Sequence, residues 1–578
     1  MREGARLAGM PHVALLFILG VIALAAVLTW QRVADERKWT ERYLEGFGAP
    51  IERTRDLERA AAWFRGRERA NAATGAIDDR TWRDLDMDAV WATLDRTASQ
   101  VGAQILYDRL RRPAVDTAEP ASFEAAVERL GGDAALRMRV TRDLLRLKDW
   151  HVSFLPDLLW GALPLPLPMR ALFVADALMV VALFLVMPWW PRALLVILAL
   201  FVTNYLVKLA LRPRIDPFVP SLRALPILAV VVERLRRVDD PALAPYLEVL
   251  RHHAGSLRLL KRASRWVAFE SGSDNPALGA MAELARSFQE YFNIAFLLDL
   301  NAFNFAIERI RANQAALRAV VEAVGTLDAA IAVASVRHGW TGTWCRPRET
   351  GDIRQLHADS LRHPLLADAV ANDFQADGKS WLVTGSNMSG KSTFLRTVGV
   401  NAVLARTIHT VRATRWEGNA FAVRSCIGRS DSLLEGKSYY LAEVEGVRDL
   451  IVASQGGAPT LFILDELFRG TNTIERIAAA RAVLEALDVA PHLVLVATHD
   501  IELLRWLGAR YEAWHFREQV ADGELLFDYR LRRGPSSTRN AVALLRLKGY
   551  PESVVLQAEA TVDEQEGNRQ QQRAPGRE

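Results

Sequence analysis

Residues 380–393 read SWLVTGSNMSGKST, and this stretch decides the fold of the C-terminal part of the chain. It begins with a short apolar run typical of a β-strand, continues through a glycine-bounded loop, and leads into a helical stretch from Phe394. The loop matches G-x-x-x-x-G-K followed by Ser or Thr, in the strand–loop–helix context that this motif requires. Glycines let the backbone wrap around an anion, so that amide N–H groups and the helix N-terminus bind phosphate.

The loop predicts a nucleotide-binding site for ATP with Mg²⁺. Lys391 is expected to reach the β- and γ-phosphates, and the Ser392 hydroxyl to ligate Mg²⁺. An ordinary glycine turn is the alternative interpretation, and the acidic motif described next disfavours it. The predicted nucleotide-binding residues of the loop are Gly385, Ser386, Asn387, Met388, Ser389, Gly390, Lys391, Ser392 and Thr393.

A continuous apolar run at 460–464 is typical of a strand buried on both faces, and it ends in Asp465 and Glu466. Such a strand end lies beside the phosphate loop, so Asp465 is expected to hold Mg²⁺ through its water shell and Glu466 to polarise the attacking water. Another apolar run, at 493–497, leads to His499, which is expected to contact the γ-phosphate or that water. Alone, either carboxylate or the histidine would be structural more often than functional. Together the motifs predict the catalytic residues Glu466, His499 and Lys391 and the metal ligands Ser392 and Asp465.

These motifs together resemble the ATPase domain of the MutS family of DNA mismatch-repair proteins, which belongs to the ABC-type ATPases. The loop TGSNMSGKST at 384–393 is similar to the family's TGPNMGGKST, and ATH at 497–499 is similar to its histidine switch. LDELFRGTNT at 464–473 resembles the family's acid pair with its RGTST segment. Further similar segments, the last of them like a helical dimerisation segment, lie at 362–364, 327–331 and 536–554.

The resemblance implies a homodimer, joined through the ATPase domain, with composite ATP sites. GKSYYLAE at 436–443 is similar to the family's signature segment, in which a serine, here Ser438, is offered to the nucleotide of the opposite subunit. The turn at 470–473 is expected to come from the opposite subunit as well. Asp431 resembles a family position that faces the nucleotide, and Asn387 is expected to stabilise the loop or contact the nucleotide. DNA is the cargo that the resemblance favours, bound mainly through its phosphates.

The similarity is dense over about 340–565, fainter over 215–340 and absent before residue 215. No N-terminal mismatch-reading domain with a Phe-x-Glu wedge is evident, and the sequence between the levers is too short for a full clamp domain. Tyr439 replaces a small hydroxyl residue of the signature segment, and Gly446 replaces an acidic one. The sequence therefore predicts the ATPase core and does not predict mismatch recognition.

Three apolar runs are long enough to cross a bilayer as helices: Val13–Thr29, Ala171–Met187 and Ala193–Leu209. Trp189 and Trp190 lie in the turn between the last two, where interfacial aromatic residues are favoured. A signal peptide is the alternative for the first run, and a buried helical hairpin in a soluble core is the alternative for the other two. Membrane lipid is therefore an expected partner.

The orientation of the chain in the membrane follows from the need for cytosolic ATP. The chain after the third run is expected in the cytosol, and the hairpin then places 31–170 inside and the N-terminus outside. The basic residues that follow the first run agree with this orientation, and a cleaved signal peptide, which would leave the ATP site outside the cell, is rejected. The predicted location is the cell inner membrane, multi-pass, with a cytoplasmic ATPase domain. Asp176 and Lys208 lie in or near the hairpin runs and are costly in lipid unless paired or snorkelled.

Composition sets broad limits. Of 578 residues, 50% are hydrophobic and 24% are charged, which excludes disorder, collagen-like fibres and disulfide scaffolds as global descriptions. Two cysteines, Cys345 and Cys426, predict neither a disulfide nor a structural metal and suit a reducing compartment. The formal net charge of +4 favours a polyanionic partner only weakly.

The run Phe292–Val336 is amphipathic and unbroken by proline, and it predicts an extended helix or a lever-like pair. The predicted fold class is an α/β P-loop (ABC-type) ATPase domain at the C-terminus, preceded by an all-α lever-like region and transmembrane helices. The predicted domains are an N-terminal transmembrane helix at 1–30, a helical cytoplasmic region at 31–165, a transmembrane hairpin at 166–212, a helical lever-like domain at 213–340, the ATPase domain with its dimerisation segment at 341–565, and a disordered tail at 566–578.

Two functions fit these predictions. The first is a membrane-anchored, ATP-dependent, dimeric DNA-binding ATPase that resembles mismatch-repair proteins, with hydrolysis coupled to lever movement. The second is a membrane-bound mechanical ATPase that acts on a protein or envelope partner without binding DNA. An ABC transporter fits less well, because three spans and a very short external turn offer no evident substrate pathway.

Overall fold

The computed structural model describes residues 30, 41, 45–72, 75–113, 118–163, 170–264, 290–351, 354–386, 388–428, 439–521, 524–535, 542, 545–546 and 548–571. Contacts divide the chain into two compact units. The helical unit contains Met1–Thr74, Leu94–Arg109 and Asp116–Gly339, and the α/β unit contains Gly75–Thr93, Leu110–Val115 and Trp340–Glu578. The predicted α/β architecture of the C-terminal part is therefore confirmed, and the predicted domain boundaries stay predictions.

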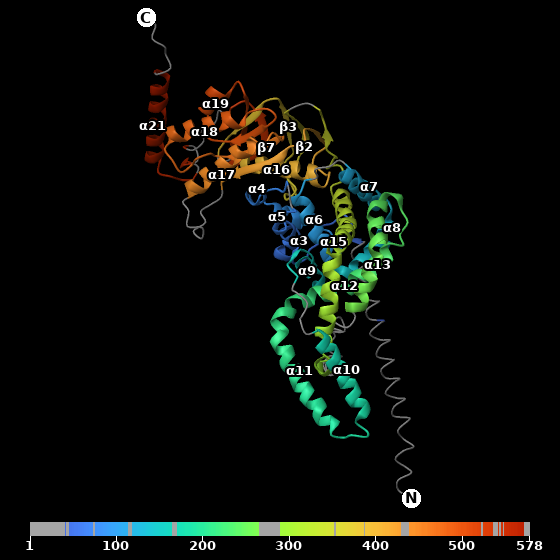
Figure 1. Cartoon of the computed structure of the whole chain (residues 1–578). Helices are drawn as coiled ribbons and strands as arrows, with labels where there is room; N and C mark the ends of the chain where they lie inside the picture. Colours follow the sequence, from blue (N-terminus) through green and yellow to red (C-terminus); the bar gives the residue numbers. More distant parts are fainter. Residues whose placement is uncertain are drawn as a thin grey trace. The chain divides into compact units, whose positions relative to one another are not determined.

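Helices build the described part of the helical unit (Figure 1). Aspartates start several of them; for example, the side chain of Asp56 accepts a hydrogen bond from Arg59 N at the beginning of α3. The α-helices are α3 Leu57–Arg69, α6 Gln100–Arg111, α7 Ala118–Gly132, α8 Ala134–Leu144, α9 Leu155–Trp160, α10 Arg170–Val186, α11 Ala193–Ile215, α12 Val219–Leu235, α13 Ala244–Ser264 and α15 Leu298–Gly339. The 3-10 helices are η1 Leu145–Lys148, η2 Trp150–Phe154, η3 Asp216–Phe218 and η4 Pro241–Leu243.

Helix α15 contains 42 residues and forms much of the core of the helical unit. It begins at Leu298, later than the predicted start at Phe292, and residues 290–296 are helical as well and are separated from α15 by a turn at Leu297. The helix bends at Asn313, where φ is −122° and ψ is 16°, and Asn313 Nδ2 donates to Arg309 O at 2.8 Å. Beyond the bend, side chains at helical spacing are buried: Val320, Val324, Leu327 and Ile331.

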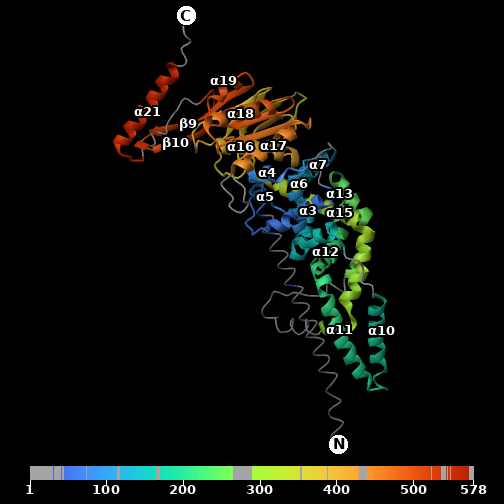
Figure 2. The same cartoon turned by 60° about the vertical axis from the view of Figure 1, so that its left-hand side comes forward.

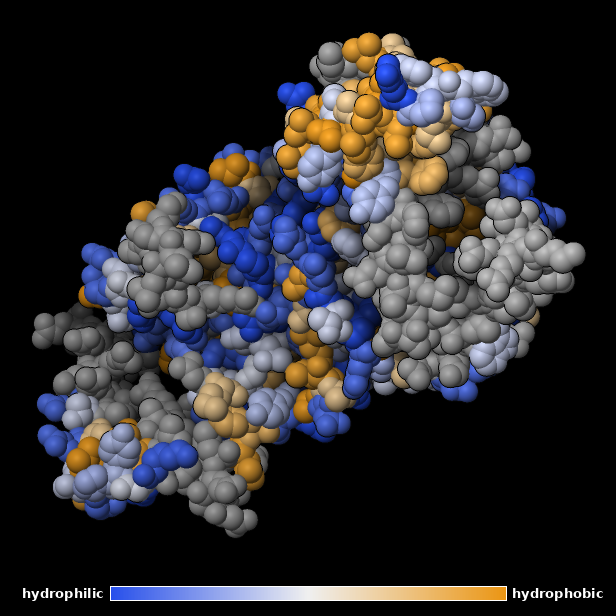
Figure 3. Space-filling view, turned by 90° about the horizontal axis from the view of Figure 1, so that it is seen from below, coloured by the Kyte–Doolittle hydropathy of each residue, from blue (hydrophilic) through white to orange (hydrophobic). Residues whose placement is uncertain are grey.

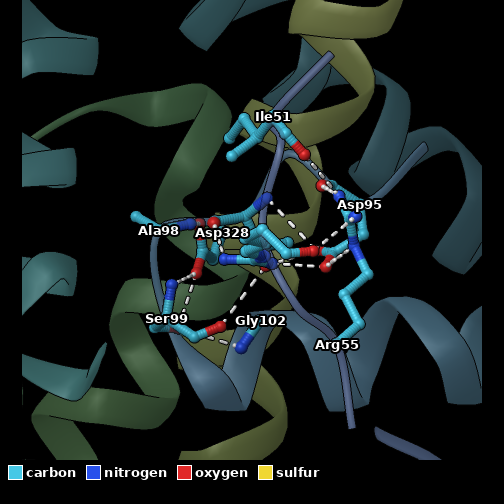
Figure 4. Close-up of polar contacts among 9 residues, drawn as sticks. Ile51, Arg55, Asp95, Ala98, Ser99, Gly102 and Asp328 are labelled. Atoms are coloured by element: carbon cyan, nitrogen blue, oxygen red, sulfur yellow. Dashed lines mark hydrogen bonds and ion pairs between the residues drawn. The ribbon is translucent and has the colours of Figure 1, made fainter. Parts of the chain in front are cut away.

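Asp328 of α15 is fully buried and joins this helix to the loop before α6 (Figure 4). Its Oδ1 accepts a hydrogen bond from Ala98 N at 2.9 Å, and its Oδ2 accepts one from Ser99 N at 2.8 Å and one from Ser99 Oγ at 2.5 Å. A Cβ at Gly102 would lie 2.1 Å from Oδ2, so a side chain at that position would displace the carboxylate. Burial raises the pKa of Asp328 to about 6, although these hydrogen bonds act in the opposite direction.

Helices α10 and α11 form an apolar hairpin that extends beyond the other helices of the helical unit (Figures 1 and 2). The hairpin is the lowest of the labelled helices in Figure 1 and so faces the reader in Figure 3, where apolar residues gather in one area. In the most apolar part of the stretch Ala193–Leu235, only 6% is buried. In the most apolar part of Phe303–Gly339, 89% is buried, and this helix belongs to the core. The predicted span Val13–Thr29 lies outside the described residues.

The α/β unit contains two sheets. The larger has the strand order β10-β9-β4-β8-β7-β6 and is parallel except between β9 and β10; the smaller has the order β1-β5-β2-β3. The strands are β1 Arg348–Glu349, β2 Gln355–Leu361, β3 Asn372–Asp377, β4 Ser380–Thr384, β5 Arg415–Gly418, β6 Ala422–Ile427, β7 Thr460–Asp465, β8 Leu493–Ala497, β9 Tyr511–Ala521 and β10 Glu524–Arg533. Every residue of β4, β7 and β8 is buried, as their apolar sequences predict.

The helices of the α/β unit come from both ends of the chain. They are α4 Asp79–Asp84, α5 Met87–Leu94, α16 Lys391–Thr407, α17 Tyr439–Ser454, α18 Thr473–Leu487, α19 Leu503–Leu507 and α21 Glu552–Gln571. Helix α4 packs on strand β6, so residues 75–93 belong to this unit although they lie within the region at 31–165 that the sequence assigns to a separate domain. Helix α21 continues to Gln571, so the predicted tail begins inside it.

Candidate nucleotide-binding site

The strand order of the large sheet brings the predicted motifs to one edge. Strand β8 lies between β4, which precedes the phosphate loop, and β7, which precedes the acid pair. Glu466 N donates to Ala497 O at 2.9 Å, so the pairing of β7 with β8 continues past the strand end. His499 consequently lies near both Lys391 and Glu466, as expected where parallel strands end together.

The phosphate loop requires glycine at two positions. Gly385 has φ +143°, and a Cβ there would lie 2.9 Å from both Phe516 O and Ser389 Oγ. Gly390 has φ +105° and is the N-cap of α16, and glycine has no side chain that could cap the helix. The first N–H groups of this 17-residue helix are therefore oriented for an anion.

Two serines hold the loop in place. Ser386 Oγ donates to Glu518 Oε2 at 2.8 Å, and Ser389 Oγ donates to Ser386 O at 2.8 Å. Met388 and Thr393 are exposed and make the outer part of the loop, with Met388 at φ +72°. Three predicted site residues lie outside the described residues, and their roles stay predictions: Asn387, Asp431 and Ser438.

Lys391, the first residue of α16, is buried against the loop. Its Nζ donates to Gly385 O at 2.9 Å and to Ser386 O at 2.8 Å, and it lies 3.4 Å from His499 Nε2. Burial lowers the pKa of Lys391, while the nearby carboxylates of Glu466 and Asp465 act to raise it. An ammonium group that is held beside the loop backbone is suited to phosphate oxygens.

Ser392 Oγ donates a hydrogen bond to Asp465 Oδ2, which joins the first turn of α16 to the end of β7. Asp465 Oδ1 is buried and has no hydrogen-bond partner among the described residues. Burial raises the pKa of Asp465, and the hydrogen bond from Ser392 opposes this shift. Mg²⁺ prefers oxygen ligands and keeps several waters, so a hydroxyl beside a carboxylate with one unused oxygen fits the predicted metal site.

Both carboxylate oxygens of Glu466 have nitrogen partners. His499 Nε2 lies 2.9 Å from Oε1, and Arg469 pairs with Oε2. Burial acts to raise the pKa of Glu466, but the hydrogen bonds and charges of His499 and Arg469 outweigh it, and the pKa is lowered. Glu466 is therefore ionised at neutral pH, which a general base requires.

Three residues around the site have no role assigned from the sequence: Arg469, Glu443 and Glu518. Glu443 of α17 is buried, and its Oε1 accepts a hydrogen bond from Phe468 N, which fixes the bend after the acid pair. Glu518 of β9 is 2% exposed and holds the phosphate loop through Ser386. In the sequence, such a residue can be noticed only as a charged residue within an apolar strand or helix pattern. This pattern does not reveal which residue the charged side chain contacts.

Comparison with known families matches residues 381–566 to MutS domain V. The DNA mismatch repair protein MutS of a Thermus thermophilus strain is 36% identical over 259 residues, which cover 44% of this chain and 31% of that protein. MutS of a Chloroflexus aurantiacus strain is 32% identical over 287 residues, which cover 47% of this chain and 29% of that protein. The chain spans about a third of the length of the first curated relatives that it matches.

A longer match corrects one prediction. MutS of Rhodopseudomonas palustris BisA53 is 27% identical over 567 residues, which cover 86% of this chain and 61% of that protein. Residues 215–578 are far less than 86% of the chain, so the prediction that the similarity is absent before residue 215 is wrong. Different apolar residues can fill the same position in a helix packing. The similarity of the N-terminal helices is therefore distributed over many positions and forms no compact motif. With the phosphate loop, the acid pair and the histidine inside the residues that match domain V, the comparisons support a divergent member of the MutS family.

Proposed function

We propose that this chain is a membrane-anchored ATPase that converts ATP and water to ADP and phosphate with Mg²⁺ and acts on DNA as a homodimer. The observation that carries the proposal is a convergence of side chains at the carboxyl ends of three neighbouring strands, β4, β8 and β7. The convergent residues are Lys391, Ser392, Asp465, Glu466 and His499.

These residues divide the work of phosphoryl transfer to water. Lys391 and the first N–H groups of α16 bind the β- and γ-phosphates. Ser392 and Asp465 would hold Mg²⁺, which supplies charge neutralisation at the phosphates when it is bound. Glu466 polarises the attacking water and accepts its proton, and His499, 2.9 Å from Glu466 Oε1, orients the carboxylate.

The homodimer in this proposal rests on resemblance. Residues 436–443 and 536–554 resemble segments through which MutS ATPase domains pair. Ser438 and the turn at 470–473 would complete the nucleotide site of the other subunit. ATP then supplies contacts that close the dimer and hydrolysis removes them, so the nucleotide shifts an equilibrium between two states.

The membrane anchor is supported by the hairpin. Helices α10 and α11 have 17 and 23 residues, or about 26 and 34 Å at 1.5 Å per residue, against a hydrocarbon core of about 30 Å. At the turn between them, Trp189 and Trp190 are exposed, as suits residues at a membrane interface. The location that we propose is the cell inner membrane, multi-pass, with the α/β unit in the cytoplasm.

The alternative is a membrane-bound mechanical ATPase that drives a protein or envelope partner and binds no DNA. The exposed apolar hairpin favours this alternative, because a protein that binds DNA does not need an anchor in the bilayer. The relatives favour the DNA function, since each of those compared is named a DNA mismatch repair protein.

Nucleotide binding tests the site itself. We expect the detergent-solubilised chain to bind a fluorescent ATP analogue saturably, and Lys391→Ala to abolish this binding. Lys379→Ala removes an exposed lysine of the same unit and is the matched control, with binding unchanged. Binding by Lys391→Ala equal to that of the control would contradict the assigned phosphate site.

DNA binding separates the two functions. Homoduplex, mismatched and branched DNA are titrated with the solubilised protein over a salt series. Binding that weakens steeply as salt rises supports the DNA function, because phosphate contacts release counterions. Intact ATP hydrolysis with no binding to any of the three substrates would favour the mechanical alternative.

A further inference from the structure

The helical segment 290–296, which precedes α15, lies along helix α11 of the hairpin. Lys208 Nζ of α11 pairs with Glu290 Oε1 at 3.0 Å. Asn204 Nδ2, one turn earlier, donates to Ala295 O at 3.1 Å. An ion pair and a hydrogen bond thus join two helical segments that both belong to the helical unit.

An aromatic contact extends the same interface. The ring centroids of Phe201 and Tyr291 lie 6.1 Å apart. Positions 201, 204 and 208 are three and four residues apart, so they share one face of α11. The segment 290–296 therefore follows this face of α11 instead of crossing it at a single point.

In this packing, polar groups of the hairpin form hydrogen bonds with neighbouring helices. Asn204 is 3% exposed, and its Nδ2 also donates to Asp176 Oδ2 of α10 at 2.8 Å. Asn301 Nδ2 of α15 donates to Phe173 O of α10 at 3.3 Å. A carboxylate or amide in a bilayer is costly unless it is paired, and here both lie between helices.

The contact face lies within the length of α11 that a bilayer would cover. From Ala193 at the turn, Asn204 lies about 16 Å and Lys208 about 22 Å along the helix axis, inside a hydrocarbon core of about 30 Å. Arg212 and Arg214 in the last turn of α11 suit the far border of that core, and Lys208 is long enough to snorkel toward it.

The outer face of the segment is aromatic. Tyr291 is still 59% exposed although its ring lies beside Phe201, Phe292 is 60% exposed, and Ile294 is buried. One side of the segment therefore packs inward and the other presents large rings, which is the pattern of a helix in contact with lipid.

We infer that residues 290–296 are embedded in the bilayer beside α11 and present Tyr291 and Phe292 to the acyl chains, so that the N-terminal end of α15 is anchored in lipid. The inference rests on the proposed membrane anchor. Helix α15 runs from Leu298 to Gly339, where the chain enters the α/β unit.

Depth-dependent fluorescence quenching in proteoliposomes tests the inference. Single cysteines are labelled with bimane and quenched by lipids that carry a doxyl group on the acyl chain. The native thiols interfere little, because burial raises the pKa of Cys345 to about 11 and that of Cys426 to about 12, and Cys345→Ser is added as background. The labelled variants are Phe292→Cys, Leu185→Cys in the hairpin and Trp150→Cys, an exposed position of the same unit outside the hairpin.

We expect the loss of fluorescence at Phe292→Cys to match that at Leu185→Cys and to exceed that at Trp150→Cys. Quenching at Leu185→Cys without quenching at Phe292→Cys would overturn the inference and leave the anchor standing. If Leu185→Cys is not quenched either, the proposed anchor fails, and the inference fails with it. Equal quenching at all three positions would indicate adsorption to the vesicle and would also count against the inference.

Thiol cross-linking provides a second test that does not depend on lipid. In the full chain, Phe201→Cys with Tyr291→Cys should be joined by a short bis-maleimide cross-linker, because the ring centroids of the two native side chains lie 6.1 Å apart. Val202→Cys with Tyr291→Cys is the matched control, because Val202 is exposed on a different side of α11. Equal cross-linking of both pairs, or cross-linking of neither, would contradict the packing of 290–296 on the 201–208 face.

Discussion

Asp84 accepts a hydrogen bond from Ser425 Oγ at 2.8 Å, although the two residues lie 341 positions apart in the chain. The same carboxylate oxygen accepts a hydrogen bond from Ile427 N at 2.8 Å, and Ser425 N donates to Thr81 Oγ1 at 3.0 Å. Residues 75–93 are thereby fixed to β6, the strand that leads to the predicted signature segment at 436–443. A segment far from the nucleotide motifs in sequence is thus part of their structural support.

Replacing Asp84 should destabilise the α/β unit. Asp84→Ala leaves a buried N–H and a buried hydroxyl without an acceptor, which should lower the free energy of unfolding by about 1–3 kcal/mol. Asp368→Ala removes an exposed carboxylate of the same unit and should change it by less than about 0.5 kcal/mol. Urea unfolding followed by tryptophan fluorescence measures both, and equal losses would contradict the docking role of Asp84.

Glu466→Gln should separate binding from hydrolysis. The amide keeps the shape of the side chain but accepts no proton, so we expect kcat for ATP hydrolysis to fall by about 10²–10⁴-fold. ATP binding should persist, because Lys391 and the loop backbone are unchanged. Steady-state phosphate release and ATP titration measure the two effects. Glu485→Gln, at a partly exposed position of α18, is the control, and normal turnover in Glu466→Gln would exclude Glu466 as the base.

Arg469→Ala should move the acid limb of the pH–rate profile. Arg469 and His499 both help to lower the pKa of Glu466, so removing Arg469 should raise it. Since Glu466 in its proposed role as the base would act only when deprotonated, kcat/KM should begin to fall at a higher pH than in the unaltered chain. Arg448→Ala removes an exposed cation of α17 and should leave the profile in place. An unshifted acid limb in Arg469→Ala would show that the pair with Glu466 does not persist during turnover.

Asp328 should make stability pH-dependent. Its pKa is raised from 3.8 to about 6, so the folded chain keeps a proton there in a range where the unfolded chain has lost it. This contribution to the free energy of unfolding is fully present below about pH 4 and is lost as pH rises through about 6, with a total on the order of 3 kcal/mol. Asp328→Asn does not titrate, so the stability difference from the unaltered chain should shrink between pH 4 and pH 7. A difference that stays constant in urea unfolding would contradict the raised pKa.

The arrangement of the candidate nucleotide site was largely predictable because its motifs are local in sequence. The glycines at 385 and 390 and Lys391 lie within one loop, and an acid pair after a buried strand is expected beside that loop. The contact of His499 with Glu466 also follows from the rule that parallel strands end at one edge. By contrast, the link between Glu518 and Ser386 depends on which strand is added beyond β4, and no local pattern specifies that order.

The hairpin also combines features that the sequence predicts with contacts that it does not predict. Apolar runs of membrane length are visible in the sequence at 171–187 and 193–209, because hydrophobicity is a property of each residue. The partners of the polar residues within them are not visible. Asn204 forms a hydrogen bond with Ala295, which lies 91 positions later in the chain. Neither segment contains a sequence pattern that predicts this contact.

The amino-acid sequence alone determined the phosphate loop, the acid pair, the apolar spans and the helical or α/β character of each region, since periodicity and residue chemistry act over a few neighbouring positions. Only the tertiary structure decided that Asp84 supports β6, that Arg469 pairs with the carboxylate of Glu466 and that residues 290–296 lie on α11. These contacts join residues that are distant in the chain or set apart by a tight bend. They form only where burial removes water and makes each polar group require a partner, and that condition exists only in the folded chain.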